Sequence, residues 1–212
     1  MPLLVQIHVA RGELEEAAKL MALFSSFEEA EDLQSRAVYA AVGALCRRAE
    51  GRAEEALPIA VAGFELTREL SLSTYAVREA FVEAVEAAFD LGDLETVEEL
   101  LAIVGGLLPG EMAPSVGAHL SRFGARLAAL RHLEDEVEPG FKMAAGTFRE
   151  LAMPFWMAVT LLEHGEWLGG AGRTGEAGPF LDEAAETFGR LGARPWLERL
   201  ARARGPELAP AN

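Results

Sequence analysis

The sequence between residues 137 and 156, VEPGFKMAAGTFRELAMPFW, is followed by a near copy between residues 177 and 196, AGPFLDEAAETFGRLGARPW. A small residue, a proline, a phenylalanine, a leucine and a tryptophan recur 40 residues later, and only the second proline is shifted by one position. Self-similarity at a period of roughly 20–50 residues is typical of stacked repeat proteins. These two stretches therefore predict a helical-repeat architecture.

The same register extends along the whole chain. One small or apolar residue stands in the first turn of each predicted second helix, and we call these five positions the anchors. Successive anchors are 39, 41, 40 and 40 residues apart: Ala17, Ala56, Val97, Val137 and Ala177. Five residues before each anchor the sequence has glycine in four copies and histidine in one: Gly12, Gly51, Gly92, His132 and Gly172. Glycine accepts the left-handed conformation that closes a helix, so the first helix of each pair is expected to end there.

Acidic residues and prolines place the start of each second helix independently. An acidic residue follows each of these turns within four positions: Glu13, Glu54, Asp93, Glu134 and Glu176. Acidic groups are favoured near a helix N-terminus by the helix dipole. Pro58, Pro139 and Pro179 stand two residues after three of the anchors, and proline is tolerated near a helix start but not deep inside a helix.

The predicted fold is an all-α superhelix, a tetratricopeptide-like solenoid of about five helical hairpins with a capping helix, because Ala, Leu, Glu and Arg dominate the sequence and strand patterns are scarce. Residues 1–204 are expected to form a single domain, followed by a flexible tail at 205–212. The second hairpin is expected to have its helices near 28–49 and 53–69, and Pro109, Gly110 and Pro114 mark the loosest joint. The hairpins are predicted at 2–24, 28–69, 74–105, 113–151 and 155–191, and the capping helix at 195–204.

Composition narrows the classes of partner and location. The net charge of −15, from 34 acidic and 19 basic residues, argues against a phosphate backbone as the main partner. Cys46 is the single cysteine, which excludes a disulfide framework within the chain and favours a reducing cytoplasm. The N-terminus lacks the pattern of a signal peptide, and no window of about 18 apolar residues predicts a membrane span. We expect a cytoplasmic protein.

The first predicted hairpin is incomplete, because its opening helix is shorter than the others. Leu3, Leu4, Val5 and Ile7 would be half covered there, whereas end repeats of solenoids usually carry a polar outer face. Two explanations are open: the chain is the C-terminal piece of a longer solenoid, or this end packs on another subunit.

Several stretches of the sequence resemble a known protein family. Small residues recur where a tetratricopeptide repeat packs its helices together, twelve residues before each anchor: Val5, Ala44, Val85, Ala125 and Gly165. FRELAMPFW at 148–156, LLEHGEWL at 161–168 and LDEAAETFGRLGARPWLERL at 181–200 resemble the C-terminal tetratricopeptide-like region of large bacterial signalling ATPases and transcriptional regulators, of cyclase-associated or LuxR type. The resemblance is strongest over residues 130–204. It implies a sensor or scaffold arm in signalling or transcription regulation, and it carries over neither ATPase motifs, cyclase carboxylates nor a DNA-recognition helix.

The sequence contains no strong motif for catalysis, cofactor binding or metal binding. The glycine-rich stretch at 169–176 lacks the Lys-Ser/Thr pair of a phosphate loop and is predicted to be an inter-helix turn. His8, His119, His132 and His164 lie in different repeats without metal-ligand spacing, and Cys46 is interpreted as a buried small apolar residue. We therefore predict no catalytic, cofactor-binding or metal-binding residues. The aromatic residues of the last hairpin and cap are interpreted as core: Phe155, Trp156, Trp167, Phe180, Phe188 and Trp196.

One charged group is a candidate partner-binding site. His119, Arg122 and Arg126 share a helix face at spacing i, i+3, i+7, and an arginine pair can grip a peptide carboxylate or a phosphate. The alternative is that inter-repeat salt bridges satisfy these residues. The acidic residues for such bridges are Glu79, Glu83 and Glu86 on one side and Glu163 and Glu166 on the other.

The leading functional hypothesis is a non-enzymatic scaffold that binds a protein or peptide in its concave groove, or adjacent domains of a longer chain. One alternative is an effector-sensing domain that binds a small molecule between repeats in a pocket lined by aromatic residues. Another alternative is self-association into a homo-oligomer through the N-terminal end.

Overall fold

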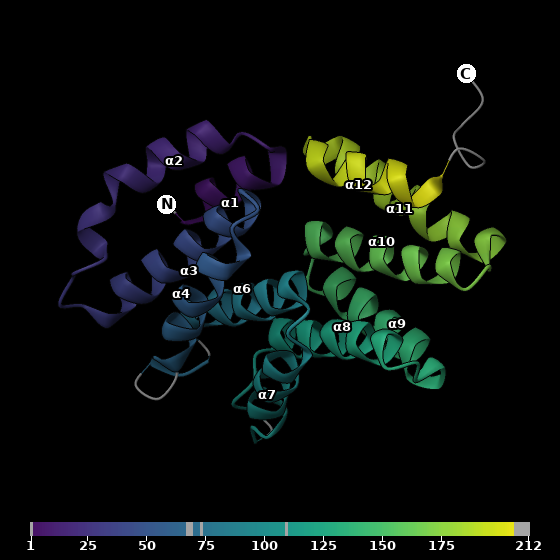
Figure 1. Ribbon diagram of the computed structural model, residues 1–212, viewed down its shortest axis with the longest axis horizontal. Coiled ribbons are helices and arrows are strands. Elements are labelled where there is room, and N and C mark those ends of the chain that lie inside the picture. The colour runs from purple at the N-terminus through teal and green to yellow at the C-terminus, as the bar shows by residue number, and fades with distance from the viewer. Residues whose placement is uncertain (1, 67–69, 73, 109, 206–212) are drawn as a thin grey trace. The chain divides into compact units, whose positions relative to one another are not determined.

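The computed structural model describes residues 2–66, 70–72, 74–108 and 110–205. This described part contains eleven α-helices and no strand, which confirms the predicted all-α class. The helices, with one 3-10 turn η1, are α1 (Pro2–Arg11), α2 (Leu14–Leu23), η1 (Ser25–Phe27), α3 (Leu33–Ala49), α4 (Ala53–Glu65), α6 (Tyr75–Leu91), α7 (Leu94–Gly105), α8 (Pro114–Leu130), α9 (Glu134–Glu150), α10 (Pro154–Gly170), α11 (Thr174–Leu191) and α12 (Arg194–Arg204) (Figure 1).

The chain divides into two compact units, Met1–Val116 and Gly117–Asn212, and each is described by itself. The boundary lies in the first turn of α8, close to the joint predicted at Pro114. Pro109 and the tail from 206 to 212 lie outside the described residues. The single domain expected over residues 1–204 stays a prediction.

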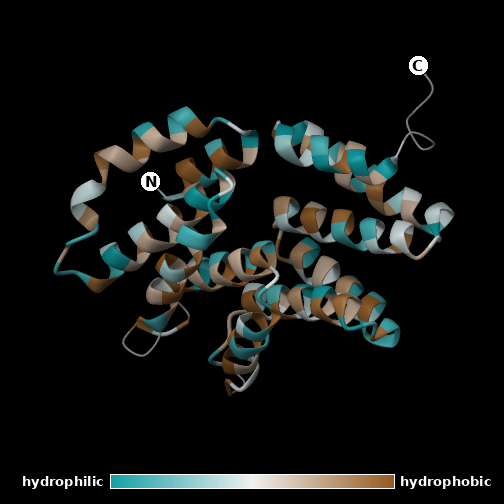
Figure 2. Ribbon diagram, in the orientation of Figure 1, coloured by the Kyte–Doolittle hydropathy of each residue, from teal (hydrophilic) through white to brown (hydrophobic). Residues whose placement is uncertain are grey.

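Consecutive helices pack as antiparallel hairpins within each unit. In unit 1, α1 packs on α2, α3 on α4 and α6 on α7, and the first helices α1, α3 and α6 also contact their neighbours in this series. In unit 2, α8 and α9 share a core of Ala125, Ala128, Val137 and Phe141, while α10 packs on α11 and α12 covers both. Apolar residues, brown in Figure 2, follow one stripe of most helices and polar residues the other, as expected for helices that bury one face.

The turns inside the hairpins have the predicted conformation. The four glycines five residues before an anchor have φ between +71° and +76°, and His132 stands in the same conformation at φ +57°. Each turn is closed by the same backbone hydrogen bond, in which the residue after the left-handed position donates to a carbonyl five residues earlier; Leu133 donates to Ala128 at 2.9 Å. The register predicted from the anchors is thus confirmed by backbone geometry.

Positive φ also occurs between hairpins, at Gly110 with φ of +96° and at three residues that share one position in the repeat, two of which are not glycine. Ser71, Ala152 and Gly192 have φ of +63°, +52° and +70°, and each lies fifteen residues after an anchor. An L-residue with a Cβ is strained in this region. The 40-residue register therefore extends to the outer turns even where the side chains differ.

The small residues between helices are required by packing. A Cβ added at Gly165 would lie 2.6 Å from Cδ2 of Leu181, and one added at Gly140 would lie 2.9 Å from Cβ of Ala125. Both distances are shorter than real Cβ contacts, so larger residues would push the paired helices apart.

Helix ends differ from the prediction mainly in the second hairpin. The first helix was expected from residue 28 but begins at Leu33, because Asp32 caps it by accepting hydrogen bonds from the backbone N–H of Gln34 and Ser35 at 3.3 and 2.9 Å. Its partner was expected to reach residue 69, but α4 ends at Glu65, and residues 67–69 lie outside the described part. In the glycine-rich stretch at 169–176, residues 171–173 form the predicted turn between α10 and α11, while 169–170 end α10 and 174–176 begin α11.

Candidate functional site

A buried ion pair joins two first helices of unit 2. Arg122 of α8 donates from Nε and Nη2 to the two carboxylate oxygens of Glu163 on α10, at 2.6 and 2.7 Å. The two residues are 0% and 4% exposed. This parallel two-bond geometry is the strong form of arginine–carboxylate pairing, and breaking it by removing one partner leaves a buried charge.

Two further guanidinium groups approach the same carboxylate. Nη1 of Arg126 lies 3.4 Å and Nη2 of Arg199 lies 3.9 Å from Oε1 of Glu163. Arg199, on α12, also donates to both oxygens of Glu166 at 2.8 and 2.6 Å. The side chains of Arg126 and Arg199 are 19% and 34% exposed, whereas that of Glu163 is 3% exposed. Three arginines thus meet around one buried carboxylate, and two of them reach solvent.

Aromatic rings pack against the guanidinium groups of this arginine cluster, which consists of Arg122, Arg126 and Arg199. The guanidinium of Arg122 lies 4.8 Å from the ring centroid of Phe123 and 5.3 Å from that of Trp156. Arg199 lies 5.5 Å from the centroid of Trp196. Such cation–π contacts orient the guanidinium groups and lower the cost of burying them.

The three predicted partner-binding residues differ in burial and in what they contact. His119 is 4% exposed and stands against Phe123, Phe148 and Trp156, with ring centroids 5.7, 4.8 and 4.6 Å away. Arg122 is buried with Glu163 in an inter-repeat salt bridge, which was the alternative to partner binding. Arg126 is the member of the predicted set that reaches the surface. Partner binding by these residues stays a prediction.

Sequence reasoning missed Arg199, although the repeat contains a signal for it. Arg199 lies 80 residues after His119, which is two periods, and α12 therefore occupies the place of a further first helix. The pair Trp156 and Trp196 shows the same 40-residue relation. Treating residues 195–204 as a cap hid this equivalence.

A second buried histidine lies in the packing of α10 against α9 and α11. His164 is 1% exposed, and its ring centroid lies 5.4, 6.1 and 4.3 Å from those of Phe141, Trp167 and Phe180. Its Nε2 atom is buried without a hydrogen-bond partner in the described part of the chain. Burial lowers the pKa of His164 to about 4. This imidazole is therefore neutral at physiological pH.

Unit 1 has a polar row along α6. Tyr75 donates to Oε1 of Gln6 at 2.7 Å, and Nε2 of Gln6 donates to Glu79 at 2.6 Å. One helical turn later, Nε of Arg48 donates to Glu83 at 2.9 Å. Burial, with a contribution from the Glu83 carboxylate, raises the pKa of Glu79 to about 7. Burial also raises the pKa of Glu83, although Arg48 opposes this effect.

Two further features lie in unit 1, a pocket and a thiol. A pocket of about 510 Å³ at the turn from α3 to α4 is lined by both charge signs, including Arg48, Arg52, Glu55 and Asp90. Cys46 is partly exposed rather than fully buried as expected, and burial among its neighbours raises its pKa to about 11, which makes the thiol a weak nucleophile. Within the described ranges, no cluster of three or more His, Cys, Asp or Glu side chains could hold a metal ion.

Of the six aromatic residues of the last hairpin and α12 that were predicted to be core, one is fully buried and five pack partly buried against the core. Phe188 is 0% exposed, and five partly buried rings pack against its cluster or the adjoining one: Phe155, Trp156, Trp167, Phe180 and Trp196. None of the helices in the described residues has the length and apolarity needed to cross a membrane. Comparison of the chain with protein-family models, with curated proteins and with solved structures finds no match.

Proposed function

We propose that this chain is a non-enzymatic, tetratricopeptide-like scaffold that mediates protein–protein or interdomain interaction. The proposal includes its role as the regulatory arm of a bacterial signalling or transcription regulator in the cytoplasm. Support comes from the repeated hairpins and from ion pairs that join neighbouring first helices within each unit, such as Arg48 with Glu83 and Arg122 with Glu163. Such repeats bind partners through the side chains of successive first helices.

The observation that carries the proposal is the arginine cluster around Glu163. Arg126 and Arg199 approach the same buried carboxylate, 3.4 and 3.9 Å from its Oε1 atom, and both are partly exposed. Arg199 is also oriented by two hydrogen bonds to Glu166. Two guanidinium groups fixed on one side by aromatic rings and Glu163 form a pre-organised site for an anionic group. The partner is therefore a peptide segment with an acidic side chain or a C-terminal carboxylate that approaches between α8 and α12.

Selection from a displayed peptide library tests this function. We expect the full chain to enrich peptides with acidic residues or a free C-terminal carboxylate, and Arg126→Gln with Arg199→Gln to lose that enrichment. Arg190→Gln with Arg202→Gln is the matched control, because it removes the same charge from exposed positions of unit 2. The control should keep the enriched peptides. Equal enrichment by the Arg126/Arg199 variant, or no enrichment of acidic peptides by the wild type, would refute the proposal.

A further inference from the structure

The first helix exposes three large apolar side chains on one face. Leu3, Leu4 and Ile7 of α1 are 61%, 47% and 37% exposed, although Val5 between them is 2% exposed. In the repeat register these residues lie fourteen, thirteen and ten positions before the anchor Ala17. The same register positions in later hairpins show what this face is built to contact.

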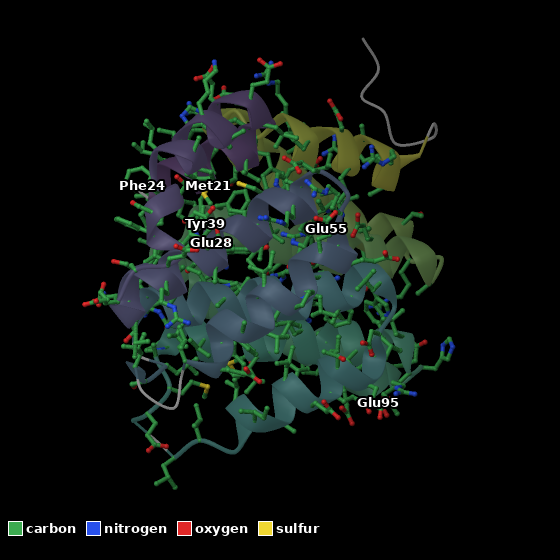
Figure 3. All side chains as sticks on the ribbon, turned by 60° about the vertical axis from the view of Figure 1, so that its left-hand side comes forward. Met21, Phe24, Glu28, Tyr39, Glu55 and Glu95 are labelled. Carbon is green, nitrogen blue, oxygen red and sulfur yellow. The ribbon has the colours of Figure 1, made fainter. Side chains whose placement is uncertain are left out.

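In the second hairpin these positions are occupied by Val42, Gly43 and Cys46, and the preceding hairpin covers them. Val42 is 4% exposed and shares a core cluster with the anchor Ala17, against which Met21 and Cys46 also pack. A Cβ at Gly43 would lie 3.8 Å from Cε of Met21. Met21 is labelled on α2 in Figure 3 and stands four residues after the anchor.

The fifth hairpin repeats this arrangement in the other unit. His164 and Trp167 lie thirteen and ten positions before their anchor. His164 stacks on Phe141 at 5.4 Å, and Trp167 packs on the cluster that contains Phe141 and the anchor Val137. Phe141 stands four residues after Val137, as Met21 does after Ala17. In both units, therefore, the positions thirteen and ten before the anchor pack toward the residue four positions after the preceding anchor. The position fourteen before the anchor is Val42 in the second hairpin, in a cluster with Ala17, and Glu163 in the fifth, where its partner is Arg122 of the preceding first helix.

We propose that Leu3, Leu4 and Ile7 form a docking surface for one further helical hairpin of the same repeat type, supplied from outside residues 1–212. The hairpin is recognised by its second helix, which presents a small or β-branched residue and, four positions later, a long apolar side chain such as Met or Phe. This interface continues the one that the described hairpins already form with each other. The inference goes beyond the peptide-binding function and rests on different residues.

A second copy of this chain does not fit as the occupant. The matching face of the last hairpin, at Ala177 and Leu181, is 1% exposed at both residues, and α12 packs on the same helix with Leu200 in the same cluster. Pairing of two α1 helices would join three exposed apolar side chains on each side, whereas stable protein–protein interfaces use roughly 20–30 residues a side. A helical hairpin with an uncovered second helix avoids the first conflict, and its own first helix can add contacts to α1, as α1 does to α3.

A tandem chain tests the proposal. A copy of residues 2–41 is joined directly to Leu3 of the full chain, so that the copied Ala41 takes the place of Pro2 and one continuous first helix results. Leu3, Leu4 and Ile7 then stand where Val42, Gly43 and Cys46 stand in the second hairpin. Because Leu4 is larger than glycine, a second version has Met21→Ala in the copy to leave room for it.

The readout is hydrogen exchange of the amides of α1. We expect exchange in at least one tandem version to slow by roughly tenfold or more relative to the wild-type chain, because a docked hairpin must leave before α1 opens. Leu4→Glu with Ile7→Glu in the same tandem chain should return exchange to the wild-type rate. If neither version slows exchange, or if the glutamate variant is protected equally, the docking surface does not exist.

Sedimentation of the wild-type chain tests the choice of occupant. We expect a monomer whose mass does not change across a roughly hundredfold concentration range. Dimerisation that Leu4→Glu with Ile7→Glu abolishes would overturn the proposal in favour of a second copy on this surface.

Discussion

Acidification should weaken unit 2 through His164. This residue is 1% exposed, and burial lowers its pKa from 6.5 to about 4. The charges that contribute are Glu138 and Lys142 on α9 and Arg173 next to α11; the first favours the proton and the other two oppose it. Because the unfolded chain binds a proton that the folded chain excludes, stability is complete above about pH 6.5. It is lost as the pH falls toward 4.

The magnitude follows from the pKa difference. A shift from 6.5 to about 4 corresponds to about 3 kcal/mol once the pH is below both values, at 1.36 kcal/mol per pKa unit. At about pH 5 the imidazole is protonated in the unfolded chain but still largely neutral in the folded one, so the loss there is about 2 kcal/mol. Other carboxylates titrate in this range as well, and a variant is needed to isolate the histidine.

Urea denaturation of the wild type and of His164→Phe at about pH 7.5 and pH 5 makes the comparison. Phenylalanine fills the space among Phe141, Trp167 and Phe180 and has no proton to bind. Tryptophan fluorescence reports on unit 2, since all three tryptophans lie there. We expect the wild type to lose about 2 kcal/mol more than the variant between the two pH values. Equal losses would refute the reasoning, because they would show that His164 takes up its proton in the folded state as readily as in the unfolded one.

Three further results are expected. His132→Gly should raise the free energy of unfolding by about 0.5–1 kcal/mol, because φ of +57° strains a residue with a Cβ; unchanged stability in urea denaturation would show that the turn carries no strain. Glu163→Gln should cost about 3 kcal/mol or more, because Arg122 is left buried without a carboxylate; a variant as stable as the wild type in thermal unfolding would contradict this. In the folded chain the pKa of Glu79 is raised from 4.5 to about 7, so folding opposes ionisation of this carboxyl group and the wild type loses stability as the pH rises through this range. Glu79→Gln removes the ionisable group and should therefore abolish this loss of stability in unit 1. The expected gain is about 3 kcal/mol at pH 8, and hydrogen exchange of α6 that has the same pH profile in both proteins would count against it.

The repeat pattern predicted the helices and turns well because each turn depends on local chemistry. Glycine at a left-handed position identifies itself in the sequence, and the period alone was enough to assign His132 to the same role. Ala152 could not be recognised from its identity, and only its alignment with Gly192 marks it. The start of α3 was placed too early because Asp32 was not recognised as a cap among several acidic residues.

The site was harder to predict, since spacing shows that residues share a helix face but not how deeply that face is buried. Arg122 and Arg126 are four residues apart on α8, yet the first is 0% exposed and the second reaches solvent. Their depth depends on Glu163, which lies 41 residues from Arg122, and on the rings that enclose the pair. Long-range partners of this kind are not contained in the local pattern.

The ion pairs between hairpins have a consequence for how the repeats choose their neighbours. The helices meet through buried alanines together with other apolar side chains, and apolar packing alone discriminates weakly between correct and shifted neighbours. Arg122 with Glu163 joins α8 to α10, and Arg173 with Glu138 and Arg149 with Glu183 join α9 to α11. A shift of one hairpin would leave Arg122 buried without its carboxylate, which costs several kcal/mol, whereas the exposed pairs contribute little. We infer that the buried pair fixes the order of the hairpins more than it adds stability. Replacing Arg122 and Glu163 together by Leu should therefore preserve helix content and most of the stability while broadening the NMR signals of α8 and α10, and sharp, unshifted signals would refute this role.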